Sequence, residues 1–177
     1  SDGSGTTFVF TQHLAEISPE FDDEVGCDKS VVFPVGIGGK GNEGVTALVK
    51  QTPGMIGYVE FGYAHQNGLA CAAVENKSGE FVAPTPESGA AALASVELPE
   101  NLRAWPVDPA APGAYPITTF TWLLLPEKYD DAAKLKALKD FVAYGLTGGQ
   151  SCAAELGYIP LPESVVAKAN AALATIE

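Results

Sequence analysis

Short apolar segments alternate along this chain with segments of helical periodicity, and this alternation constrains the fold more than any other feature. Helices place apolar residues three or four positions apart, whereas buried strands read as short continuous apolar runs bounded by turn residues. An alternation of the two is typical of α/β folds, in which helices cover a sheet. We expect strands at residues 31–35, 55–60 and 117–125, and a hairpin that joins 69–74 to 80–82.

The expected helix boundaries follow from capping and breaking residues. Phe10, Leu14 and Ile17 form one apolar stripe, which predicts a helix that ends at Ser18. A second helix is expected from an N-cap at Asn42 to residues 52–54, where Thr-Pro-Gly ends it. The remaining expected helices follow Pro86, cover residues 130–144, surround Cys152, and begin with Pro162 as the first residue. The prolines of residues 99–116 predict an extended connection.

The chain is strongly acidic, with 10 Lys and Arg residues against 22 Asp and Glu residues and a formal net charge of −12. A surface of this sign repels nucleic acid and anionic membranes, so no nucleic-acid partner is expected. A small anionic ligand remains compatible with it, because clustered backbone N–H dipoles hold an anion whatever the net charge. Residues 120–125 form an apolar run that is far too short to span a bilayer.

Neither the cysteines nor the histidines form the pattern of a metal site or a catalytic centre. Cys27, Cys71 and Cys152 lack CxxC and CxxH spacing, so no metal and no other cofactor is predicted. A Cys27–Cys71 disulfide and three buried thiols remain equally good interpretations. His13 and His65 are too few and too far apart to hold a metal, and His65 is expected at the surface. No nucleophile-elbow motif occurs, and no catalytic residue is predicted.

The most informative chemistry lies at Ser4, Gly5 and Thr6, directly before the first helix. The first N–H groups of a helix have no partner within it, and the helix dipole adds positive potential there. Glycine lets the backbone approach a ligand closely, and two hydroxyls supply neutral donors. This combination suits a phosphate or a sulfate. An ordinary serine-capped helix explains the same residues and, from them alone, is the simpler interpretation.

The glycine-rich stretch at residues 36–41, Gly-Ile-Gly-Gly-Lys-Gly, has a nucleotide-binding appearance that its spacing does not support. Lys40 is followed by Gly41 rather than by Ser or Thr, so the stretch is not a P-loop. Gly41 also arrives one residue too early for the G-x-G-x-x-G pattern. We interpret the stretch as a loop that caps a helix.

Five stretches, taken together and in order, resemble the phosphate-binding proteins of high-affinity phosphate ABC transporters. They are SDGSGTTF at residues 1–8, PVGIGGKGNEG at 34–44, QTPGMIGYVE at 51–60, YPIT at 115–118 and YIPLPESVV at 158–166. The resemblance implies an α/β, periplasmic binding protein-like (class II) two-lobed fold, here incomplete. Residues 1–114 would form part of the second lobe, with the anion-binding helix start. Residues 115–177 would supply the crossover strand and the C-terminal helices that complete the first lobe.

The resemblance also implies roles for individual residues. Ser4, Gly5 and Thr6 match positions that donate hydroxyl and backbone N–H groups to phosphate. Asp2 matches an acidic residue that orients a phosphate-binding arginine two positions before it, and this arginine is absent from the sequence. The N-terminal segment of the family, which supplies the other lobe's donors, is absent too. We therefore expect a fragment or one chain of a nicked protein, with Asp2 unpaired near the site and residues 117–125 facing the missing N-terminal segment.

The function that the resemblance implies is the capture of inorganic phosphate and its delivery to an ABC transporter permease, in the periplasm or another extracytoplasmic space, without catalysis. One alternative is a binding protein for another tetrahedral oxyanion, such as sulfate. A different alternative is an enzyme that acts on a phosphoester with Ser4 as the nucleophile. That enzyme would need a base or a metal, which no motif supplies.

Overall fold

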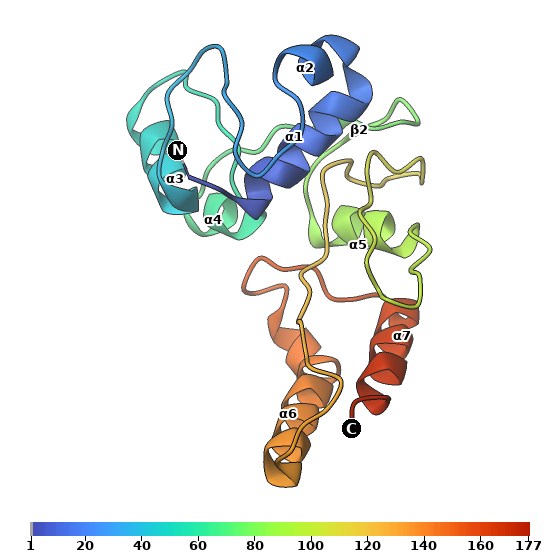
Figure 1. Ribbon diagram of the computed structural model, residues 1–177. Helices are drawn as coiled ribbons and strands as arrows, with labels where there is room; N and C mark the ends of the chain where they lie inside the picture. The colour runs from blue at the N-terminus through green and yellow to red at the C-terminus, as the bar shows by residue number, and fades with distance from the viewer. Residues whose placement is uncertain (1) are drawn as a thin grey trace.

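The computed structural model describes residues 2–177, and Ser1 lies outside the described residues. Figure 1 shows α1 to α4 grouped at one end of the molecule, α6 and α7 at the other end, and α5 between them. In chain order the elements are α1 (Gly5–Ile17), α2 (Pro19–Glu24), α3 (Gly41–Gln51), α4 (Phe61–Gln66), β1 (Val74–Glu75), β2 (Phe81–Val82), α5 (Pro86–Ala94), α6 (Ala132–Gly145), the 3-10 helix η1 (Gly148–Cys152) and α7 (Glu163–Ala174).

The helices begin and end close to where the sequence predicts them. Ser4 is the N-cap of α1, and α1 ends before Ser18 as expected. Two starts are wrong by one or two positions: α3 begins at Gly41 behind Lys40 rather than after Asn42, and Pro162 is the cap of α7 rather than its first residue. The short helices α2 and α4 were not expected. A serine cap, a proline at the first position and acidic residues in the first turn are the sequence signals for α2.

The strands predicted at residues 31–35, 55–60 and 117–125 are wrong as strands, because these segments are in no ladder. Within residues 2–177 the sheet consists of β1 and β2 alone, which pair antiparallel with Val74 opposite Val82, and this hairpin was predicted. Ile117 makes one isolated antiparallel bridge to Val107. An apolar run indicates that a segment prefers burial, but a strand also needs a neighbouring backbone to accept and donate its hydrogen bonds.

The main core lies where α5 and α7 meet the start of the segment at residues 117–125. Its buried members are Leu93, Leu98, Phe120 and Val165. Trp122 packs against this cluster and donates its indole N–H to the Leu102 carbonyl at 2.8 Å. The core therefore joins residues that lie before position 114 to residues that lie after position 115, and it holds α5 against α7.

In α1 the deepest burial falls on polar residues rather than on the predicted apolar stripe of Phe10, Leu14 and Ile17. The buried residues are Thr7, Thr11 and His13, whereas Ile17 is 52% exposed. The Thr11 hydroxyl donates to the Thr7 carbonyl at 2.8 Å, which satisfies a buried polar group within the helix itself. Threonines can thus line a packed helix face, and an apolar stripe alone does not identify that face.

The exposure of the cysteines and of His65 can be compared with the expectations from the sequence. Cys27, Cys71 and Cys152 are all free and exposed, so neither a Cys27–Cys71 disulfide nor three buried thiols is correct. His65 is exposed, as predicted. Among residues 2–177, no helix combines the length and the apolar character needed to cross a bilayer.

Candidate functional site

The stretch that leads into α1 is held in an extended conformation and then capped by its own serine. The Ser4 backbone N–H donates to the Lys29 carbonyl at 2.9 Å. The Ser4 hydroxyl oxygen accepts hydrogen bonds from the backbone N–H groups of Thr6 and Thr7, at 3.1 Å and 3.4 Å. The ordinary capping role is therefore present, and it leaves the hydroxyl hydrogen of Ser4 available as a donor, because a hydroxyl accepts and donates at the same time.

The space in front of this helix start is open. Gly5 is the first residue of α1 and is exposed, and a methyl group built on it would meet no atom within 4 Å. Ser4 and Thr6 on either side are half-buried. The N–H group of a first helical residue has no partner within the helix. The structure thus brings Ser4, Gly5 and Thr6 together around one helix start, with open space where a side chain of residue 5 would stand.

The first turn of α1 also differs from the other α-helices in charge. Among residues 2–177, each of the other α-helices has an acidic residue at its N-cap or in its first turn, and α1 has none. An acidic side chain near a helix start already balances the positive end of the helix dipole. The first turn of α1 itself therefore carries no acidic side chain that balances the positive end of the helix dipole.

Asp2 is not unpaired, contrary to the expectation from the absent arginine. Its carboxylate accepts a hydrogen bond from the backbone N–H of Gly41, the first residue of α3, at 3.1 Å. Lys40, the N-cap of α3, makes no capping bond with its side chain. Asp2 therefore serves as a cap for α3 from a segment 39 residues away, and its negative charge lies at the start of that helix.

The glycine-rich stretch forms the tight entrance to α3. Gly41 has a φ of +65°, which a residue with a side chain rarely adopts. Gly39 lies so close to the first turn of α3 that a methyl group on it would stand 2.6 Å from the Val45 nitrogen. These contacts agree with the interpretation of residues 36–41 as a loop that caps a helix.

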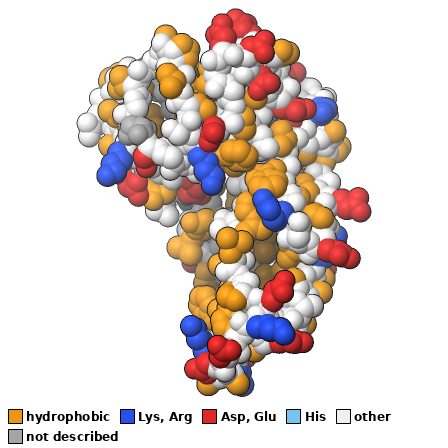
Figure 2. Space-filling model, viewed as in Figure 1, with side chains coloured by type: hydrophobic (Ala, Val, Ile, Leu, Met, Phe, Trp, Pro, Cys, Tyr) orange, Lys and Arg blue, Asp and Glu red, His pale blue; other side chains and the backbone are white. Residues whose placement is uncertain are grey.

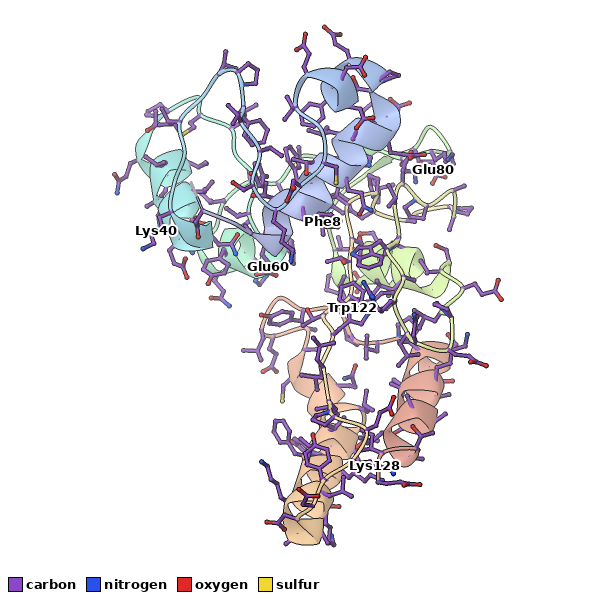
Figure 3. The ribbon with its side chains drawn as sticks, viewed as in Figure 1. Phe8, Lys40, Glu60, Glu80, Trp122 and Lys128 are labelled. Carbon is purple, nitrogen blue, oxygen red and sulfur yellow. The ribbon has the colours of Figure 1, made fainter. Side chains whose placement is uncertain are left out.

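The start of α3 is already surrounded by carboxylates of the protein. Glu43 accepts a hydrogen bond from the Tyr63 hydroxyl at 2.7 Å, and this bond holds the pKa of Glu43 below its usual value. Glu60 caps α4 through a bond from the Gly62 N–H at 3.0 Å. Figure 3 shows Lys40 and Glu60 in the part of the molecule that holds α3 and α4, with Glu60 between Lys40 and Trp122 in this view. These carboxylates would repel an external anion at the start of α3.

The side chains that hold the candidate site in place were not predicted from the sequence. The Tyr58 hydroxyl lies 2.9 Å from the Thr7 hydroxyl, and its ring stacks on Phe10. Trp105 contacts Phe8 of α1 on one side and Trp122 on the other, with ring centroids 6.4 Å and 5.3 Å apart. Tyr58 lies 51 positions from Thr7 in the chain, so only the folded structure reveals its contact with α1.

No donor set for a metal accompanies these residues. Within the described part of the chain, no three His, Cys, Asp or Glu side chains gather in a way that could hold a metal ion. His13 is buried on α1, whereas His65 is exposed on α4. The polar groups that the start of α1 presents are hydroxyl and backbone N–H groups, a donor set of the kind that suits an anion.

Comparison with known proteins relates this chain to anion-binding proteins along nearly its whole length. It is 42% identical over 173 residues to the phosphate-binding protein PstS of Xylella fastidiosa, a match that covers 97% of this chain and 48% of the relative. It is 43% identical over 173 residues to PstS of Pasteurella multocida, covering 97% and 50%. PstS of the archaeon Methanocaldococcus jannaschii is 43% identical over 183 residues, covering 93% and 47%.

The chain thus spans about half the length of the curated relatives that it matches. These relatives confirm the resemblance that the five sequence stretches indicated. Residues 1–146, which include Ser4, Gly5, Thr6 and the start of α3, match the PBP superfamily domain. Because that match covers 146 of the 177 residues, this chain belongs to the PBP superfamily.

Proposed function

We propose that this chain forms part of an extracytoplasmic receptor that captures inorganic phosphate and delivers it to an ABC transporter permease, without catalysis. The observation that carries the proposal is the start of α1, where Ser4, Gly5 and Thr6 surround an open helix end without an acidic side chain in the first turn. The relatives that share 41–43% of the sequence are named phosphate-binding proteins. In this proposal the anion accepts hydrogen bonds from the Ser4 and Thr6 hydroxyls and from the backbone N–H of Gly5, because the N–H groups of Ser4 and Thr6 already donate to Lys29 and to the Ser4 hydroxyl oxygen.

The second part of the proposal is that another segment completes the phosphate cleft. The relatives have about twice the length of this chain. Surface depressions lie beside β2 and α5 and beside α2, and neither of these two includes residues 2–7. We assign residues 1–114 to the second lobe and residues 115–177 to the part that completes the first lobe. The missing N-terminal segment would close over the start of α1 and supply the remaining donors.

Calorimetric titration of the full-length protein that contains this chain, with inorganic phosphate and with sulfate in parallel, tests the function. We expect tight phosphate binding and much weaker sulfate binding. Phosphate at neutral pH carries a proton, and we expect the missing N-terminal segment to supply a buried carboxylate that accepts it. Sulfate lacks this proton and would face that carboxylate without a hydrogen bond. The chain of 177 residues alone should bind both anions weakly and without preference. Equal affinity of the full-length protein for the two anions would favour a general oxyanion receptor instead.

A phosphoester-processing enzyme is not favoured by the names of the relatives, which are all binding proteins. Hydrolysis through Ser4 would need a base or a metal beside it. The full-length protein should leave a chromogenic phosphomonoester unchanged at a protein concentration that saturates the phosphate site. Turnover that Ser4→Gly abolishes would contradict the proposal of a receptor without catalysis.

A further inference from the structure

One aromatic residue outside the anion site contacts the first two turns of α1 at two points. The Tyr58 and Thr7 hydroxyl oxygens are 2.9 Å apart, although the two residues are 51 positions apart in the chain. The Tyr58 ring also stacks on Phe10, with ring centroids 4.2 Å apart and an interplanar angle of 12°. Thr7 and Phe10 are three residues apart and therefore lie on the same face of the helix. Tyr58 consequently contacts one face of α1 with both its ring and its hydroxyl.

Thr7 connects this contact directly to the helix start. Its backbone N–H donates to the Ser4 hydroxyl oxygen at 3.4 Å, and its side chain is buried against Tyr58. Its carbonyl accepts the Thr11 hydroxyl at 2.8 Å, which fixes the next turn. A rotation of α1 about its own axis would separate Thr7 from Tyr58 and unstack Phe10. Because Gly5 and Thr6 precede Thr7 immediately, the same rotation would turn their donors away from the open side.

We propose that Tyr58 is a positioning residue for the anion site, and this inference rests on the proposed function. The hydroxyl contact and the stacked ring set the rotation of the first turn of α1, so that Ser4, Gly5 and Thr6 direct their donors toward one point. Tyr58 acts through Thr7 rather than on the anion itself. A hydrogen-bond donor array gains affinity when it is held in its bound geometry before the ligand arrives.

The test measures phosphate affinity by calorimetry in the full-length protein with Tyr58→Phe, which keeps the ring and removes the hydroxyl. Loss of one neutral hydrogen bond that positions the site is expected to weaken phosphate binding about 2- to 10-fold. Thr7→Val removes the other hydroxyl and should give a similar loss, whereas Thr7→Ser keeps a hydroxyl and should restore most of the affinity. The double variant Tyr58→Phe/Thr7→Val should bind no more weakly than either single variant, because all three lack the same bond.

The matched control is Tyr63→Phe. This substitution also removes a tyrosine hydroxyl, which donates to the Glu43 carboxylate of α3 at 2.7 Å and has no contact with α1 among the hydrogen bonds of the described residues. It should leave the phosphate affinity unchanged. Thermal unfolding without phosphate accompanies each titration, so that a general loss of stability is seen separately.

The outcomes distinguish the positioning role from the proposed function. If the unsubstituted protein binds phosphate and Tyr58→Phe binds it equally well, the positioning role is wrong while the function stands. If additive losses are found in the double variant, the two hydroxyls act independently and the inference is overturned. If the unsubstituted protein binds no phosphate, the proposed function itself fails.

Discussion

At the scale of single residues, Ser4 combines a structural and a proposed binding role at the start of α1. Its hydroxyl oxygen accepts from the N–H groups of Thr6 and Thr7, and its hydroxyl hydrogen remains available to an anion. A substitution therefore changes helix stability and anion affinity together. The two effects can be separated, because glycine is tolerated at an N-cap almost as well as serine, whereas alanine is not.

Ser4→Gly and Ser4→Ala should both weaken phosphate binding by about 1–3 kcal/mol, the range for a lost hydrogen bond to a charged group. Only Ser4→Ala should also lower the free energy of unfolding, by about 0.5–2 kcal/mol. Calorimetry and urea unfolding measure the two quantities. Ser18→Ala is the control, because Ser18 caps α2 through a bond from the Phe21 N–H at 3.2 Å. It should lower stability without changing affinity, and phosphate binding unaffected by Ser4→Gly would show that the site lies elsewhere.

His13 is the residue whose protonation opposes folding. Its side chain is 2% exposed, and neither ring nitrogen has a hydrogen-bond partner among residues 2–177. Burial lowers the pKa of His13 below 6.5, and the nearby Asp108 offsets part of this effect. Since the unfolded chain takes up the proton near pH 6.5 and the folded chain only at a lower pH, acidification favours the unfolded state in that window.

We expect the free energy of unfolding to fall as the pH decreases through about 6.5, by at most about 1.4 kcal/mol per pH unit from this one group. Urea unfolding between pH 7.5 and pH 5.5 (chosen to bracket the ordinary histidine pKa of about 6.5) measures the slope. His13→Gln should flatten the profile in this window. His65→Gln makes the same change at an exposed histidine and should keep the slope of the parent chain. An equal slope in all three proteins would contradict the assignment to His13.

At the scale of elements, the glycine-rich stretch shows how a motif can serve packing rather than nucleotide binding. Asp2 caps α3 from outside, and Gly39 allows residues 36–41 to lie directly against the first turn of that helix. The carboxylate of Asp2 thereby links the stretch before α1 to the start of α3. Two helix starts that lie far apart in the sequence are held together in this way.

Gly39→Ala should destabilise the fold by about 1–3 kcal/mol, as overpacking does in a close contact. The added methyl group would stand 2.6 Å from the Val45 nitrogen and 2.7 Å from the Gly44 carbonyl carbon, so backbone has to move. Gly145→Ala is the matched control at the end of α6, where a methyl group meets no atom within 4 Å. It should be neutral or stabilising by up to about 1 kcal/mol, because alanine favours a helix over glycine. Equal stability of the two variants in urea unfolding would contradict the close packing of residues 36–41.

At the scale of the whole molecule, large apolar side chains are exposed over the end that carries α6. Leu124 is 91% exposed, and the others are Leu123 at 66%, Phe141 at 70%, Tyr144 at 62%, Leu156 at 55% and Tyr158 at 56%. Figure 2 shows hydrophobic side chains over the centre and lower half of the face in view. Contiguous apolar surface on a soluble chain indicates an interface. We propose that the missing N-terminal segment of the first lobe covers it, since the relatives are about twice as long as this chain.

A separately expressed segment that corresponds to the other half of the full-length protein should form a 1:1 complex with this chain, measured by sedimentation velocity. Leu124→Asp should weaken the complex about 10- to 100-fold, because it removes the burial of a leucine side chain and places a charge there. Phe81→Asp is the control, since Phe81 is 73% exposed on the β1–β2 hairpin. Two halves that never associate, or an equal effect of the two substitutions, would exclude this face as the contact.

The sequence by itself determined the features whose hydrogen bonds close within a few residues. The start of α1 behind Ser4, the start of α5 at Pro86 and the hairpin turn at residues 76–79 lie where the sequence patterns predict them. The position of the candidate anion site at a helix start follows from the same local rule.

Only the tertiary structure decided which segments pair and which faces are buried. Residues 117–125 have the composition of a strand, yet a strand exists only beside another backbone that completes its hydrogen bonds. The contacts of Asp2 with Gly41 and of Thr7 with Tyr58 join positions 39 and 51 residues apart. A local sequence pattern cannot predict these contacts, because only the folding of the chain brings the two partners together. The free energy of each contact also depends on the burial and packing of the surrounding residues.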